Sequence, residues 1–336
     1  MNHPSNPPRR SDRRATWFLI ILLVSPVLML LGLLMGGDWR HPGFLFEPQG
    51  KGLLVARSWR VLLGGVTGAS LSAAGVVLQA VLRNPLAEPF VLGLSSGAGL
   101  AAALCILGGG LALGGLFLPA SGFAGALISL AVVYSLARVG RHAAPASLLL
   151  AGVIWGSLCG SALMFLVSQS SAEGLHAILW WFLGDLQVYD ASLISRISIL
   201  MIVVVVGLTY FARDLNALLL GDEMSQHVGL NVERSRIVVL SLAALLTASA
   251  VSTSGMIGFV GLVIPHAMRS LVGADHRRLI PAAALSGGAF LVLADGLGRM
   301  LFYPVEVPVG IITSLVGGPF FLYLLRRKNR ELWSGA

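Results

Sequence analysis

Charged side chains are scarce in this chain. Asp, Glu, Lys and Arg make up 11% of its 336 residues, against roughly a quarter in a typical soluble globular protein. Hydrophobic residues make up 56%. With so little polar surface, a soluble globular domain is excluded. A bilayer-spanning helix needs roughly 20 mostly apolar residues, so the apolar content suffices for about nine or ten spans.

Cysteine and lysine are also rare, with two of each. Cys105 and Cys159 both lie inside apolar runs, which excludes a disulfide scaffold and gives no metal-binding pattern. Neither Lys51 nor Lys328 is followed by Ser or Thr, whereas a phosphate-binding P-loop ends in Gly-Lys-Ser/Thr. We therefore predict that this chain binds no cofactor and no metal, and that any ATP and its magnesium are bound by a separate subunit.

Long apolar runs predict an all-α polytopic membrane protein with about ten transmembrane helices. The first run is too long for a signal-peptide core and is read as a retained helix. The predicted spans are Trp17–Met35, Val61–Leu82, Val91–Leu107, Leu116–Ala137, Ser147–Val167, Leu193–Phe211, Ile237–Val251, Met256–Val272, Leu279–Leu297 and Val307–Leu325.

The positions of the basic residues fix the direction of these spans. With the N-terminus inside, six of the 23 Lys and Arg residues fall on the outer side and the rest in cytoplasmic segments, as the positive-inside rule requires. Both termini are thus predicted to be cytoplasmic, and the net charge of +8 reflects these loops rather than nucleic-acid binding. The chain divides into a basic cytoplasmic tail (1–16), a transmembrane domain (17–325) with a cytoplasmic segment (213–236), and a cytoplasmic tail (326–336).

Ionisable groups inside the predicted spans are few: Arg196, His266, Arg269 and Asp295. A secondary carrier driven by protons or sodium usually has such groups near the membrane midplane, and here only His266 is central. We read it as a packed helix-end histidine. An intramembrane enzyme would need a paired catalytic constellation, which the sequence lacks, so no catalytic residue is predicted. The pair Asp275-His276 is expected on a solvated face.

Three segments predicted on the cytoplasmic side carry distinctive residues. The first, residues 83–99, reads RNPLAEPFVLGLSSGAG, the second, 220–230, reads LGDEMSQHVGL, and the third, 257–278, begins IGFVGLVIPH and ends in DHRR. In the first, two prolines bracket a tight turn and small residues after it permit close helix contact. The second is too polar to span a membrane.

At these residues the sequence resembles the FecCD-type permeases, the membrane subunits of ABC importers for iron–siderophore complexes, haem and vitamin B12. The resemblance covers about Arg57 to Arg327, with several motifs in the family's order and spacing. It implies ten helices per subunit with both ends cytoplasmic, which agrees with the independent count.

The resemblance also implies roles for individual residues. The segment 221–229 is similar to the helices that couple such permeases to their ATPase, and the implied coupling residues are Gly221, Asp222, Glu223, Ser225 and Gly229. Ser225 departs from the small Ala common in the family. The turn of Asn84, Pro85 and Leu86 is similar to a cytoplasmic gate.

Two further sites are implied on the outer side. Leu179, Trp180, Trp181 and Gly184 lie in a segment similar to a short helix at the outer mouth, although an interfacial aromatic belt gives the same pattern. Arg57, Arg60 and Arg299 occupy edges that receive the binding protein in similar permeases, although snorkelling anchors remain an alternative reading.

We therefore expect the permease subunit of an ABC importer in a bacterial inner membrane, translocating an iron–siderophore complex or a similar large chelate by alternating access. Cobalamin or haem is the alternative cargo, and an ion-coupled secondary transporter the remote alternative. The chain itself would not be an enzyme. The expected partners are ATPase subunits, a periplasmic or lipid-anchored substrate-binding protein, a second permease copy in a homodimer, and membrane lipid, but no nucleic acid.

Overall fold

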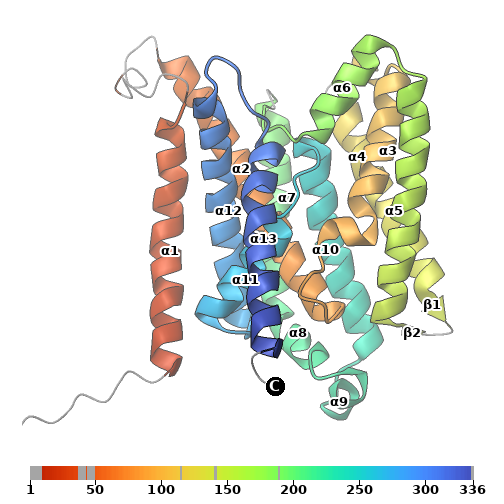
Figure 1. Ribbon diagram of the computed structural model, residues 1–336, viewed down its shortest axis with the longest axis vertical. Helices are drawn as coiled ribbons and strands as arrows, with labels where there is room; N and C mark the ends of the chain where they lie inside the picture. Colours follow the sequence, from red (N-terminus) through yellow and green to blue (C-terminus); the bar gives the residue numbers. More distant parts are fainter. Residues whose placement is uncertain are drawn as a thin grey trace, which may run out of the picture.

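The protein is a bundle of long, nearly parallel helices in a computed structural model (Figure 1). The structure describes residues 10–36, 43, 50–113, 116–139, 142–187 and 190–333. Its α-helices are α1 (Arg10–Leu34), α2 (Lys51–Val81), α3 (Leu94–Leu107), α4 (Phe117–Ala137), α5 (Pro145–Ser168), α6 (Ala172–Phe182), α7 (Ala191–Tyr210), α8 (Ala212–Leu218), α9 (Asp222–His227), α10 (Val232–Ser254), α11 (Val260–Val272), α12 (His276–Leu301) and α13 (Val309–Trp333).

Minor elements join some of these helices. Two short 3₁₀ helices, η2 (Pro89–Leu92) and η3 (Gly110–Leu113), flank α3, and the two-residue strands β1 (Arg138–Val139) and β2 (His142–Ala143) pair antiparallel between α4 and α5. Helices α6, α7 and α10 are each preceded by a capping residue, namely Ser171, Asp190 and Asn231. The side chain of each cap accepts a hydrogen bond from a backbone N–H in the first turn. Such caps satisfy donors that a helix start leaves without partners.

Each of the ten predicted spans corresponds to a helix, so the all-α fold is confirmed. Seven helices within the described residues are long and apolar enough to cross a membrane, and α3, α11 and the first part of α13 are shorter apolar helices. At 1.5 Å per residue, α3 and α11 each cover only about 20 Å. They occupy opposite halves of the bundle, α3 the upper and α11 the lower half in Figure 1.

Helix α2 lies at the centre of the bundle and packs against α12, α10, α11 and α7. Its crossings with α11 and α12 are made at glycines, where Gly75 meets Gly261 and Gly68 meets Gly287 backbone to backbone. α2 begins at Lys51, ten residues before the predicted start, and its 31 residues extend about 46 Å. Since the hydrocarbon core is about 30 Å thick, Arg57 and Arg60 lie on an extension of this helix.

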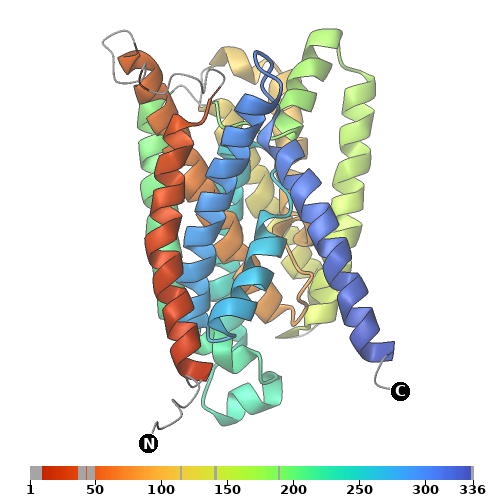
Figure 2. The same ribbon diagram turned by 60° about the vertical axis from the view of Figure 1, so that its left-hand side comes forward.

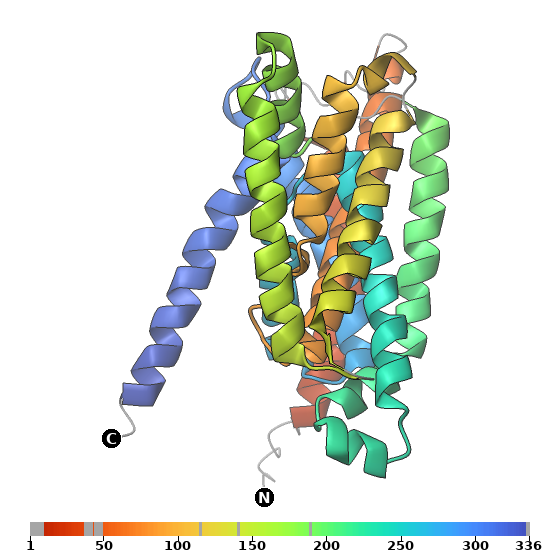
Figure 3. The same ribbon diagram turned by 90° about the vertical axis from the view of Figure 1, so that its right-hand side faces the viewer.

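The two ends of the bundle differ in character. Helix α1 begins, and α13 ends, at the end of the bundle where α8 and α9 lie, whereas α6 lies at the opposite end (Figures 1 and 2). Figure 3 shows α9 projecting beyond the ends of the long helices. The basic loops assign the α9 end to the cytoplasm, which places the start of α1 and the end of α13 there.

Candidate translocation and coupling sites

The segment predicted to couple to an ATPase forms the short helices α8 and α9 at the cytoplasmic end. Gly221 precedes α9 with a φ of 105° and Gly229 follows it with a φ of 86°, a backbone region that glycine adopts without steric cost. Glu223 is exposed, whereas Ser225 is buried and its hydroxyl donates to the carbonyl oxygens of Ala217 (2.7 Å) and Gly221 (2.5 Å). A buried hydroxyl therefore fastens α9 to the end of α8, which an alanine could not do.

Asp222 is the electrostatic centre of this segment. Its carboxylate accepts hydrogen bonds from Arg236 Nη2 at 2.9 and 3.0 Å and also contacts Arg83. Partial burial by itself raises the pKa of the Asp222 carboxyl, but the hydrogen bonds and charges of Arg236 and then Arg83 outweigh burial and hold this pKa below its ordinary value. Asp222 therefore remains ionised throughout the physiological pH range.

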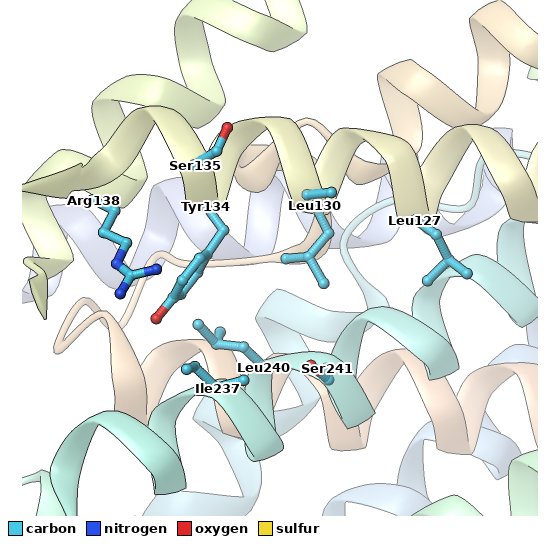
Figure 4. A pocket seen from close by; sticks show the side chains of 9 residues that line it. Leu127, Leu130, Tyr134, Ser135, Arg138, Ile237, Leu240 and Ser241 are labelled. Atoms are coloured by element: carbon cyan, nitrogen blue, oxygen red, sulfur yellow. The ribbon is translucent and has the colours of Figure 1, made fainter. Parts of the chain in front are cut away.

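The polar contacts continue from Arg236 to α4. Arg236 is 1% exposed and lies 3.7 Å from the carboxylate of Glu233, which in turn accepts a hydrogen bond from the Tyr134 hydroxyl. Tyr134 stands beside Arg138 at the polar end of a groove of about 600 Å³ between α4 and α10 (Figure 4). Leu127 and Leu130 line the groove farther along α4, so most of its length is apolar.

The predicted gate turn follows the end of α2. The Asn84 side-chain oxygen accepts from the Leu86 N–H at 2.9 Å, and its backbone oxygen accepts from the Ala87 N–H at 3.0 Å. Pro85 and Leu86 are exposed, Leu86 to 42%. The sequence predicted a tight turn between two prolines, and the two bonds to Asn84 close it from within.

The segment predicted to form a helix at the outer mouth is α6, whose Leu179 and Trp180 are exposed. Its end is tied to the break between α10 and α11, because the Asp185 N–H donates to the Ser254 oxygen at 2.9 Å. Gly184 has a φ of 76°, and a side chain there would meet Ile257 at 2.9 Å. Trp181 packs against the apolar cluster of Ala98, Ala126, Ala248 and Val251. Sequence reasoning missed this attachment, since no local pattern signals it.

The three outer arginines do not form an exposed patch. Arg299 is 5% exposed and Arg60 15%, and both pair with the buried Asp295, at 3.1 and 2.7 Å. Arg60 also donates to Glu306 at 2.8 Å. Arg57 is half-buried and donates to the Leu33 carbonyl oxygen at 3.3 Å. Arg60 and Arg299 thus form ion pairs inside the chain. Of the three arginines, Arg57 remains the candidate contact for a binding protein.

Two histidines lie in other surroundings than the sequence predicted. His276 is fully buried rather than solvated, because its Nδ1 and its backbone N–H both bind the Asn216 side-chain oxygen, at 2.6 and 3.0 Å. Its neighbour Asp275 is exposed, caps α12, and has a pKa held below its ordinary value, first by a hydrogen bond from Asn216. His266 lies midway along α11, half-buried, rather than at a helix end. Among the described residues, no cluster of His, Cys, Asp or Glu could hold a metal ion.

Comparison with known proteins supplies the wider context. A family model described as the FecCD transport family matches residues 19–327. A cobalamin import system permease of Halobacterium salinarum is 45% identical over 80% of this chain and 72% of its own length. A hemin transport system permease of Yersinia pestis is 43% identical, covering 81% of this chain and 82% of its own. A ferric citrate import permease of Bacillus subtilis is 37% identical over 81% of each chain.

A solved structure agrees with the fold. It is described as an inward-facing conformation of a metal-chelate type ABC transporter, and it is similar to this chain with a TM-score of 0.81 and 28% sequence identity. The match covers 93% of this chain and 99% of that chain. The likeness therefore extends over the whole bundle rather than over one group of helices.

Proposed function

We propose that this chain, which belongs to the FecCD transport family, conducts a metal chelate across a bacterial inner membrane. It is the membrane-spanning permease subunit of an ABC importer. The observation that carries the cargo proposal is that three similar permeases are named for cobalamin, hemin and ferric citrate. All three compounds are metal ions enclosed by an organic chelator, so the permease need not coordinate the metal itself.

An iron chelate is our first candidate, and cobalamin or haem is the second. The second is favoured by a specific observation, because the permeases named for cobalamin and hemin are 45% and 43% identical to this chain and the ferric citrate permease 37%. Uptake by vesicles containing the complete importer, measured with ferric siderophore, haem and cobalamin in parallel, distinguishes the candidates. Uptake of none of the three would contradict the proposal.

The proposed mechanism is alternating access driven by a separate ATPase. Two copies of this chain form a homodimer with the pathway along the two-fold axis, since a closed pair is the commonest assembly of identical subunits. ATP and magnesium bind the ATPase subunits, this chain binds no cofactor and catalyses no reaction, and the turn at Asn84–Leu86 closes the cytoplasmic end. A substrate-binding protein delivers the chelate at the α6 end.

Reversing the charge of Glu223 is expected to weaken docking of the ATPase. Glu223 is exposed in the first turn of α9, so a lysine there would reverse the charge that α9 presents to the ATPase. For Glu223→Lys we expect severalfold less ATPase to be recovered with the purified permease. Glu173→Lys is the matched control, because Glu173 is an exposed acid in the first turn of α6 at the opposite end. Equal recovery for both variants would refute the assignment of α9.

Replacing Arg57 with glutamate is expected to slow association of the binding protein. Of the three predicted docking arginines, Arg60 and Arg299 are held in ion pairs with Asp295, whereas Arg57 bonds only a backbone carbonyl oxygen among the described residues. Opposite charges across an interface chiefly raise the association rate. The rate should fall and become less sensitive to salt. Arg196→Glu serves as control, since Arg196 is exposed on the outer part of α7. Unchanged association kinetics for Arg57→Glu would show that this arginine only anchors the helix.

A further inference from the structure

The carboxylate of Asp222 joins two arginines that belong to different parts of the molecule. Arg236 lies on α10, 14 residues along the chain, and is 1% exposed. Arg83 lies 139 residues away, between the end of α2 and the gate turn, and its side chain is 36% exposed. Arg236 therefore holds the Asp222 carboxylate, and with it α9, against the body of the bundle. Arg83 contacts the same carboxylate from the end of α2.

The backbone of Arg83 supports the same reading. Its φ is 48°, a left-handed conformation that is uncommon for residues other than glycine, asparagine and aspartate. Such a conformation persists where surrounding contacts over-determine it. Here Arg83 Nε also donates to the Leu218 carbonyl oxygen at 3.2 Å, at the C-terminal end of α8, where helix carbonyl groups lack intrahelical partners. The guanidinium thus binds α8 and α9 together.

The gate turn begins at the residue after Arg83. The two hydrogen bonds to Asn84 fix the chain from Asn84 to Ala87 as one tight unit. Beyond that unit, Pro89 lies beside Gly261 in the first turn of α11, where a Cβ atom added to Gly261 would meet the Pro89 ring at 3.2 Å. The turn is therefore held on one side by α8 and α9 and on the other by the first turn of a half-length helix.

We propose that Arg83 is the positioning residue through which α9 controls the gate turn, with Asp222 as its contact on α9. The proposal rests on the proposed function, in which an ATPase displaces α9. Charge-assisted hydrogen bonds from the two-pronged guanidinium are strong and directional, so a displacement of α9 is passed to the residue before Asn84. Arg83 contacts no cargo in this role.

Thiol labelling of the assembled permease–ATPase complex tests the proposal. Cys105 and Cys159 are first replaced by alanine, and single cysteines are then introduced as Gln226→Cys on α9 or Leu86→Cys in the turn. Modification by a membrane-impermeant maleimide is measured without nucleotide and with ATP and vanadate. We expect the ATPase to protect Gln226→Cys, and the modification rate of Leu86→Cys to change severalfold between the two nucleotide states.

The decisive background is Arg83→Asn, because asparagine tolerates the left-handed backbone and only the guanidinium is lost. Protection of Gln226→Cys should persist, which shows that the variant is folded and docked, whereas the nucleotide response of Leu86→Cys should be lost. Arg83→Lys, which keeps the charge without the two-pronged geometry, should retain a reduced response. Arg234→Asn, which removes an exposed arginine from the first turn of α10, should leave it unchanged.

The outcomes separate this proposal from the one on which it rests. A full nucleotide response of Leu86→Cys in the Arg83→Asn background would overturn the role of Arg83 while leaving ATPase docking at α9 intact. An absent response without any Arg83 substitution, in a docked complex, would also overturn it. Failure of the ATPase to protect Gln226→Cys in the otherwise unaltered chain would instead contradict the coupling assignment itself.

Discussion

Replacing Asp295 with alanine is expected to lower the free energy of unfolding by about 3–5 kcal/mol, the cost of leaving buried charge without its partner. The Asp295 carboxylate is 5% exposed and pairs with both Arg60 and Arg299. After its loss, the polar contacts left within the described residues are Glu306, which is half-exposed, for Arg60 and the Gly32 carbonyl oxygen for Arg299. Unfolding of the detergent-solubilised protein, followed by helical circular dichroism across an SDS titration, measures the change.

Glu306→Ala is the matched control for Asp295→Ala. Glu306 shares Arg60 with Asp295, but its side chain is 40% exposed, and exposed ion pairs contribute only about 0.2–1 kcal/mol. We expect the control to unfold almost as the unaltered protein does. Similar small losses in both variants would mean that water reaches the arginines and that the cluster does not hold α2 to α12.

Replacing Gly75 with alanine is expected to destabilise the bundle by about 1–3 kcal/mol, the usual cost of overpacking a filled interior. A Cβ atom at this position would overlap the Gly261 carbonyl group and lie 2.8 Å from the Gly261 Cα. These are backbone atoms of α11, so no side-chain rotation relieves the contact, and the two helices must move apart. The same SDS titration measures this loss.

Gly207→Ala is the matched control and should change stability in the opposite direction. Gly207 also lies within a long helix, α7, but a Cβ there meets no atom within 4 Å. The intrinsic preference of alanine for helix, about 1 kcal/mol over glycine, is then gained without a clash. If Gly75→Ala were as well tolerated as Gly207→Ala, the helices would be free to separate and the close crossing would have no structural importance.

The disturbance expected at the Gly75 crossing affects transport as well as stability. Gly261 follows the break between α10 and α11, where the Ser254 oxygen accepts a hydrogen bond from the Asp185 N–H just after α6, and Gly261 itself lies beside Pro89, next to the gate turn. A shift of α11 at Gly75 would thus reach both the outer helix and the gate turn. We therefore expect Gly75→Ala to reduce transport more than its loss of stability alone accounts for.

Sequence by itself determined the properties that depend on local composition. Apolar runs such as Trp17–Met35 are recognisable without their neighbours, because hydrocarbon burial depends on the length and polarity of each segment. Orientation followed from the arginines in the loops, and the cytoplasmic motifs allowed a family resemblance that the comparison over residues 19–327 confirmed. The coupling segment at 221–229 could be placed as a short polar helix because its glycines and acids are adjacent in the chain.

Only the tertiary structure decided which of these residues meet. Arg60 and Asp295 are separated by 235 residues and Arg83 and Asp222 by 139, and no periodicity within a helix indicates which other helix lies beside it. The burial of His276 depended likewise on Asn216 of α8, 60 residues away. Hydropathy acts on each segment separately, whereas ion pairs and backbone crossings require two particular faces to come together, and that pairing exists only once the helices have packed.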